Sequence, residues 1–194
     1  GCGQDLSIRA LAEHLRTHPR FAATLTNHYI EMLFKSAPLH DIGKVGIPDR
    51  ILLKPGKLTT EEFEVMKTHT TLGREAIEHA EQQLKLEVPF LVIAKEIAYS
   101  HQEKWDGSGY PQALQGDAIP LSARLMAVAD VYDALISRRV YKAAMPHEQA
   151  AQIIQQGRGQ HFDPDIADAV VALQVQFQSI AGRFSDSDED IAQK

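Results

Sequence analysis

The sequence predicts an all-α fold, a helical bundle with one long structured loop. Apolar residues recur at helical spacing along most of the 194 residues, and no stretch shows the strict alternation of a half-buried strand. Apolar residues make up 44% and charged residues 24%, as in an ordinary globular domain. We therefore predict a single domain over 1–180 with a sizeable core, followed by an acidic flexible tail at 181–194.

Three helices are expected in the first half of the chain. Apolar residues recur at helical spacing over 6–16 and again over 21–39. A third helix is expected over 60–79, because Thr59 and Glu62 have the spacing of a capping box. In such a box each of the two side chains bonds the backbone amide of the other residue.

Four more helices and one long loop are expected in the second half. The helices cover 88–101 and 121–137 and begin again near Pro146 and at Pro164. Residues 105–120 contain three glycines and two prolines, which are typical of a structured loop.

Composition excludes several functional classes. The net charge of -6 argues against a broad surface for a nucleic-acid polymer. No apolar run approaches the length of a membrane-spanning helix, and the single cysteine, Cys2, rules out an internal disulfide framework. A cytoplasmic protein without a nucleic-acid or membrane partner is expected.

Metal-capable side chains interrupt the apolar pattern at four places. These are His40-Asp41, His69, His101 and Asp130. Such residues are rarely buried unless they are paired or bind a metal, and packed helices can bring them together. Imidazole with carboxylate suits iron, manganese, zinc or nickel better than calcium, and Asp41 could bridge two ions about 3.5–4 Å apart.

Each histidine also has a plainer interpretation as a satisfied core or surface residue. We apply it to His14, His18, His28, His79 and His147. The four metal-capable places are different because residues suited to a phosphate accompany them. These are Lys44, Arg139, Lys142 and the loop Gly109-Tyr110-Pro111. Asp133 shares a helix face with Asp130 and could meet substrate or Arg139.

Seven motifs in this order resemble the HD-GYP domain family, over roughly residues 8–175. They are "HDIGK" (40–44), "KPGKL" (54–58), "KTHTTLG" (67–73), "HQEKWDGSGYP" (101–111), "IPLSARLMAVADVYDAL" (119–135), "RRVYK" (138–142) and "HFDP" (161–164). The "DGSGYP" loop separates this family from the wider HD phosphohydrolases. In "HFDP", Asp163 should cap the helix that starts at Pro164.

The resemblance implies an HD-type helical core and a metal-dependent phosphodiesterase. Its members hydrolyse cyclic di-GMP to pGpG, and often to GMP, by attack of a metal-bound hydroxide on phosphorus. Two or three divalent transition metal ions are implied, iron or manganese first, with nickel or zinc as alternatives. The implied ligands are His40, Asp41, His69, His101 and Asp130.

The resemblance also assigns roles around these ligands. Lys44 would stabilise charge at the scissile phosphate and act with Asp41 in catalysis. The implied substrate contacts are Lys44, Tyr110, Asp133, Arg139 and Lys142, while Gly109 and Pro111 would shape the loop. It further allows an N-terminal receiver or sensor domain, as in a two-component response regulator, diguanylate cyclase domains as partners, and a homodimer.

Two departures from the family pattern keep alternatives open. Gln102 stands where the family usually has a second histidine, and its amide oxygen would be a weak metal ligand. The family's upstream "E-T-G-x-H" stretch is not found in this sequence. Both departures would fit an inactive module that binds a cyclic dinucleotide or docks on cyclase domains. The base specificity also stays open, since a cyclic GMP-AMP would need the same chemistry.

Overall fold

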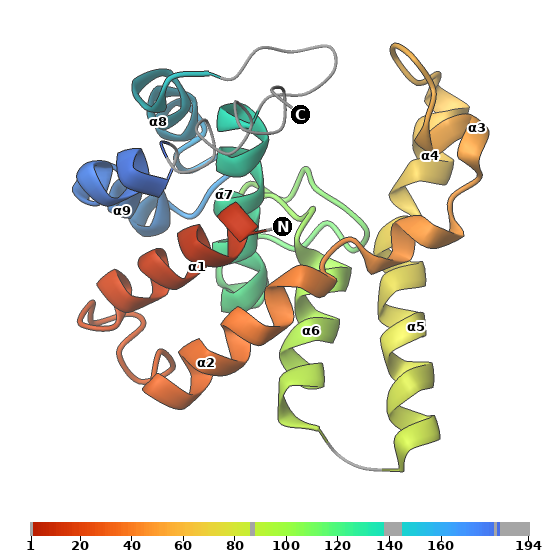
Figure 1. Ribbon diagram of the computed structural model, residues 1–194, viewed down its shortest axis with the longest axis horizontal. Coiled ribbons are helices and arrows are strands. Elements are labelled where there is room, and N and C mark those ends of the chain that lie inside the picture. Colours follow the sequence, from red (N-terminus) through yellow and green to blue (C-terminus); the bar gives the residue numbers. More distant parts are fainter. Residues whose placement is uncertain (1, 86–87, 138–144, 181, 183–194) are drawn as a thin grey trace, which may run out of the picture.

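The computed structural model describes residues 2–85, 88–137, 145–180 and 182, and these residues form helices joined by loops (Figure 1). The elements are α1 (Cys2–Leu15), α2 (Asn27–Ser36), η1 (Ala37–Leu39), η2 (Ile42–Gly46), α3 (Asp49–Leu52), α4 (Thr60–Lys67), α5 (His69–Leu84), α6 (Pro89–Ser100), η3 (Gly116–Ala118), α7 (Leu121–Ile136), α8 (His147–Gln156) and α9 (Pro164–Ala172), where η marks a 3₁₀ helix. Two isolated bridges are the β-structure of the described residues. The all-α prediction is confirmed.

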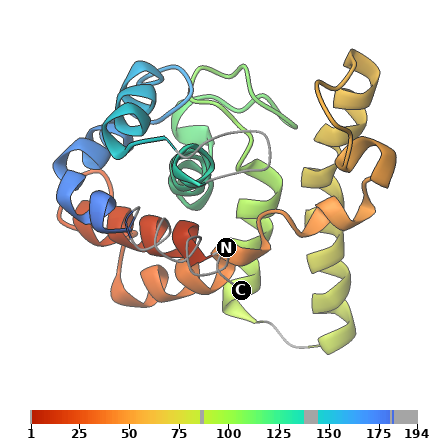
Figure 2. The same ribbon diagram turned by 45° about the horizontal axis from the view of Figure 1, so that its top comes forward.

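Helix α7 is the centre of the main bundle. Figure 2 looks nearly along it and shows α1, α6, α8 and α9 arranged around it. Leu125, Met126 and Val128 on this helix are fully buried, as expected for a helix that is apolar on every side. Tyr132 is also fully buried, and its hydroxyl is satisfied by His147 Nδ1 at 2.8 Å and the Phe177 carbonyl at 3.2 Å. The satisfied-core interpretation of His147 is confirmed.

The helix expected over 21–39 is shorter than predicted. It begins only at Asn27, where the Thr26 hydroxyl accepts the Tyr29 amide at 3.2 Å, and it gives way to η1 at Ala37. Pro38 lies in η1 and lacks the amide hydrogen that a continuing α-helix would use. Two 3₁₀ segments therefore carry the chain through 37–46.

The helix expected over 60–79 is two helices. The capping box of Thr59 and Glu62 is present, but α4 ends at Lys67 and α5 begins at His69. The Thr68 hydroxyl donates to the Val65 carbonyl at 2.6 Å, a local bond that competes with helix continuation. Helices α3 and α4 lie beyond the upper end of α5, apart from the main bundle, while α5 runs beside α6 (Figure 1).

The remaining helices lie close to their expected positions. Asp163 caps α9 by accepting the Asp165 amide at 3.0 Å, which confirms the prediction from "HFDP". Among the described residues, no helix is both long enough and apolar enough to cross a membrane. The tail predicted over 181–194 lies outside the described residues apart from 182.

Candidate metal centre

Four separate parts of the chain place metal-capable side chains at one point of the fold. His40 and Asp41 lie between η1 and η2, His69 is the first residue of α5, and His101 follows α6. Asp130 lies on α7, next to these ends. The predicted assembly of these residues by helix packing is confirmed as geometry, while their ligand roles remain predictions.

The Asp41 carboxylate lies between two groups of ligand atoms. On one side, Asp41 Oδ1 is 3.7 Å from His69 Nε2 and 3.8 Å from His101 Nε2. These two nitrogens are 3.4 Å apart, and all three ligand atoms lie within 4.8 Å of one another. On the other side, Asp41 Oδ2 is 3.3 Å from His40 Nε2, which is 3.7 Å from Asp130 Oδ1. Each oxygen of one carboxylate thus faces a different group.

Each histidine turns its Nε2 atom toward this point. His40, His69 and His101 hold their Nδ1 atoms 2.8–2.9 Å from backbone carbonyls three or four residues earlier. A carbonyl only accepts, so Nδ1 carries the hydrogen in the neutral ring and Nε2 keeps its lone pair. Metal-ligating histidines are held in the same way by a hydrogen bond from their other ring nitrogen.

Burial and charge in the cluster also suit a cation. Burial lowers the pKa of His101 to about 3 and lowers that of His69, so both rings stay neutral. Burial opposes protonation of His40 as well, but the carboxylates of Asp41 and Asp130 outweigh it and raise the pKa. Burial likewise opposes ionisation of Asp41, yet His40 and Lys44 hold its pKa well below the usual range. The site thus contains buried carboxylate charge beside the neutral imidazoles of His69 and His101.

Two buried polar atoms point to the group that would fit here. His40 Nε2 and Asp41 Oδ1 have no hydrogen-bond partner among the described residues. Buried polar atoms without a partner are uncommon in folded proteins, and a divalent cation would satisfy both. The donor set of imidazole nitrogens and carboxylate oxygens therefore fits a transition metal.

A close contact between two glycines brings Asp41 and His69 together. A Cβ atom on Gly43 would lie 1.9 Å from the His69 carbonyl oxygen and 2.4 Å from the Gly73 nitrogen. Only a residue without a side chain allows η2 to approach α5 so closely. The spacing of "HDIGK" and "KTHTTLG" thus has a packing cause as well as a chemical one.

Lys44 and Tyr110 lie at the rim of the cluster. Lys44 Nζ is 2.6 Å from Asp41 Oδ2, and its side chain is 40% exposed. The Tyr110 ring centroid is 6.4 Å from that of His69. Burial, and then the charges of Asp41 and Asp130, raise the pKa of Tyr110 to about 12, so its phenol remains a hydrogen-bond donor.

The other predicted site residues have different outcomes. Asp133 lies one turn beyond Asp130 on α7 and is partly buried. Gln102 uses its backbone carbonyl to accept the Tyr110 amide at 3.2 Å, and its suggested ligand role remains a prediction. Arg139 and Lys142 lie outside the described residues.

The predicted turn-forming role of Gly109 has a clear steric basis. A Cβ atom there would lie 2.3 Å from the Lys104 nitrogen and 2.6 Å from the Gln102 carbonyl oxygen. The loop can therefore lie directly on the backbone that follows His101. Pro111 comes directly after Tyr110 in this loop.

Sequence reasoning missed three contacts of the site. Phe63 and Lys67 of α4 cover Tyr110, with the Phe63 ring 6.2 Å from the Tyr110 ring and Lys67 Nζ 5.7 Å from its centroid. Gln4 Nε2 donates to Asp130 Oδ1 at 2.7 Å. Lys67 opens the quoted motif "KTHTTLG", so a signal was present. Phe63 and Gln4 lie outside the quoted motifs, and only the tertiary fold brings them to the site.

Comparison with known proteins agrees with this geometry. A family model described as "HD domain" matches residues 10–166. A Vibrio cholerae protein named "Cyclic di-GMP phosphodiesterase" is 59% identical over 180 residues, which cover 93% of this chain and 36% of that protein. Another V. cholerae protein, named "3'3'-cGAMP-specific phosphodiesterase 2", is 42% identical over 156 residues, which cover 80% of this chain and 29% of that protein.

A solved structure shares the fold. The HDG"Y"P protein Bd1817 from Bdellovibrio bacteriovorus matches with a TM-score of 0.57 at 18% identity, over 86% of this chain and 50% of that one. The chain spans less than half the length of the curated relatives it matches. Because the family model covers most of the chain and the motifs are present in order, the chain belongs to the HD domain family and to its HD-GYP group.

Proposed function

We propose that this domain is a metal-dependent phosphodiesterase that hydrolyses cyclic di-GMP to pGpG, GMP or both. The observation that carries the proposal is the Asp41 carboxylate, whose two oxygens face two groups of ligand atoms while Lys44 lies 2.6 Å away. This combines a cation site with a positive side chain beside it, an arrangement suited to phosphodiester hydrolysis. The name of the relative that is 59% identical supports the same reaction.

His40, Asp41, His69, His101 and Asp130 would hold two divalent ions, with iron or manganese as first candidates and nickel or zinc as alternatives. His69 and His101 lie on one side of the Asp41 carboxylate, and His40 and Asp130 lie on the other. A third ion and a contact from Gln102 stay predictions. Bound ions would lower the pKa of a water molecule and offset charge on the phosphate oxygens.

The chain's own groups then have distinct tasks. Asp41 stays ionised because its pKa is held low, so it remains an anionic ligand. Lys44 would supply positive charge where negative charge develops on the phosphate. Tyr110 keeps its proton and would donate to a phosphate oxygen or a base at the rim. Asp133, Arg139 and Lys142 would complete the substrate contacts.

The observations support the type of reaction more strongly than the identity of the substrate. One relative at 42% identity is named for a cyclic GMP-AMP rather than for cyclic di-GMP. Relative rates on these two substrates would decide the base specificity. A receiver or sensor domain, diguanylate cyclase partners and a homodimer remain proposals that the family suggests.

The test is hydrolysis of cyclic di-GMP by anaerobically purified protein, with metal content measured on the same sample. Asp41→Ala should abolish both metal binding and turnover, because it removes the two carboxylate oxygens that face the two groups of ligand atoms. Asp49→Ala is the matched control, since Asp49 is an exposed aspartate eight positions along the same segment. Turnover in Asp41→Ala would refute the site. Nucleotide binding without turnover in the wild type would instead support an inactive signalling module.

A further inference from the structure

Glu103 is a buried acid outside the metal cluster. Only 2% of this residue is exposed, although glutamate is rarely buried unless it is paired. Its partners are backbone amides of the loop that follows. Glu103 Oε1 accepts the Gln112 amide at 2.7 Å, and Oε2 accepts the Leu114 amide at 3.0 Å. One carboxylate therefore holds both ends of a three-residue stretch.

The same loop meets the segment around Glu103 at a second place. The Tyr110 amide donates to the Gln102 carbonyl at 3.2 Å. A Cβ atom on Gly109 would lie 2.5 Å from the Glu103 Cα atom, so these backbones are in direct contact. Tyr110 is thus fixed between a backbone contact on one side and the Glu103 carboxylate on the other.

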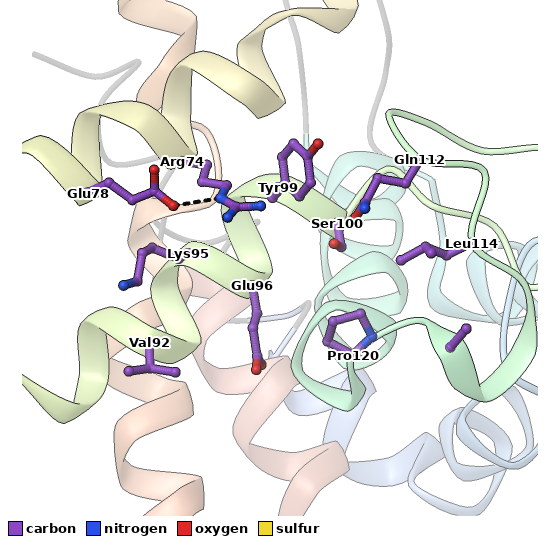
Figure 3. Close-up of a pocket in the computed structure, with 11 residues that line it drawn as sticks. Arg74, Glu78, Val92, Lys95, Glu96, Tyr99, Ser100, Gln112, Leu114 and Pro120 are labelled. Carbon is purple, nitrogen blue, oxygen red and sulfur yellow. Dashed lines mark hydrogen bonds and ion pairs between the residues drawn. The ribbon is translucent and has the colours of Figure 1, made fainter.

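Side-chain packing adds little to this part of the loop. Pro111, Gln112 and Ala113 are exposed. Figure 3 shows Gln112 and Leu114 facing Tyr99 and Ser100 of α6 across an open pocket of about 500 Å³. Because a pocket rather than packed side chains borders the loop there, side-chain packing contributes little to its position. The two bonds to Glu103 attach residues 112–114 directly, and the next attachment is at Gln115 and Gly116, where the Gly116 amide donates to the Trp105 carbonyl at 2.9 Å.

We propose that Glu103 is a positioning residue that fixes the Tyr110-Pro111 loop against the metal centre and so aligns the substrate. This inference rests on the proposed phosphodiesterase function. Glu103 does not touch the reacting atoms and acts through the loop. Tyr110 ends up 6.4 Å from the His69 ring and 6.2 Å from the Phe63 ring, measured between centroids, at the rim where a nucleotide would enter.

The hydrogen bonds between Glu103 and the two loop amides predict the effect of a conservative substitution on activity. In Glu103→Gln the size is kept, but the amide nitrogen can only donate and faces a backbone amide that also donates. One of the two bonds is lost, and a buried donor is left unsatisfied. We expect kcat/KM for cyclic di-GMP to fall about tenfold, mainly through KM, with metal content unchanged.

Three measurements separate positioning from general stability. Hydrogen–deuterium exchange of the Gln112 and Leu114 amides, measured without substrate, should rise in Glu103→Gln. Ile154→Val is the control, because Ile154 is fully buried in α8 and its change should lower stability without altering loop exchange or KM. The effects of Glu103→Gln and Tyr110→Phe on kcat/KM should be non-additive, since both act through the position of the Tyr110 hydroxyl.

Each outcome decides the inference. Unchanged exchange at both amides in Glu103→Gln would overturn it, and so would additive effects of the two substitutions. If Glu103→Gln does not fold, Glu103→Asp keeps the charge but is too short to reach both amides, and the same measurements apply. If the wild type hydrolyses no cyclic dinucleotide, the proposed function fails, while amide exchange still decides whether Glu103 holds the loop.

Discussion

Gly43→Ala is the sharpest test of how this fold builds its metal centre. The added methyl carbon would lie 1.9 Å from the His69 carbonyl oxygen and 2.4 Å from the Gly73 nitrogen. Both atoms belong to the backbone of α5 and cannot rotate away as a side chain could. The substitution must therefore push η2 and α5 apart, and these elements carry Asp41 and His69 at their ends.

The size of this displacement follows from the contact itself. Real Cβ atoms essentially never approach another heavy atom closer than 3.0 Å, so the two segments must separate by about 1 Å. Overpacking a close-packed interior costs about 1–3 kcal/mol, and we expect about 3 kcal/mol because no flexible group can yield. Metal–ligand distances tolerate about 0.2 Å, so a shift of this size should weaken metal binding at least tenfold.

Urea denaturation of metal-free protein and metal titration measure these two effects separately. Gly46→Ala is the matched control on the same 3₁₀ segment. Its added carbon would lie 2.9 Å from Leu72 Cδ1, the end of a flexible side chain that can move. We expect Gly46→Ala to retain normal metal affinity. Wild-type stability and metal affinity in Gly43→Ala would refute the close-contact argument.

Two further predictions concern substrate binding and pH. Arg139→Ala should raise KM for cyclic di-GMP more than it lowers kcat, as expected for a phosphate-holding residue, and equal losses in both would contradict that role. Burial, and then the charge of Lys104, lower the pKa of His161 to about 4, below the ordinary value of 6.5. Its contribution to the free energy of unfolding is complete above pH 6.5 and is lost as pH falls toward 4, because the unfolded state then binds a proton that the folded state does not. Urea denaturation of metal-free protein across this pH range should show a smaller loss of unfolding free energy in His161→Gln than in the wild type. Equal dependence on pH in the two proteins would contradict this role of His161.

The sequence predicted the elements better than their junctions. Most helices are close to their expected positions because their apolar periodicity reports one buried face. The break at Thr68 was missed, since a hydroxyl bond to the Val65 carbonyl leaves the periodicity on both sides intact. The late start of α2 was missed for a related reason. Phe21 and Leu25 are core residues, and they contribute to an apolar pattern without belonging to a helix.

For the site, the sequence identified the candidate residues by their type, but it did not reveal how they are arranged in space. The candidate ligands could be identified because histidine and aspartate interrupt apolar runs. The sequence allowed Asp41 to bridge two ions, but its place between two groups depends on how η2 packs on α5 and on where α7 places Asp130. Glu103 was part of a quoted motif, yet its partners are backbone amides nine and eleven residues away. Bonds to backbone amides leave no mark on the partner's side-chain type, so a single sequence does not reveal them.

The geometry separates what orients the candidate ligands from what holds the substrate loop. Each imidazole is oriented locally, by a carbonyl of the helix end that carries it. The distance between helix ends depends on packing, above all on the contact of Gly43 with α5. The loop has a separate attachment, because two of its amides bond to Glu103, which is not part of the cluster although it follows His101 by two residues. Under the proposed function, a change in the loop is therefore expected to alter which nucleotide is held, and how tightly, more than it alters the geometry of the candidate ligands. Relatives named for cyclic di-GMP and for a cyclic GMP-AMP fit such an arrangement, in which the same kind of metal site is combined with different substrate-contacting loops.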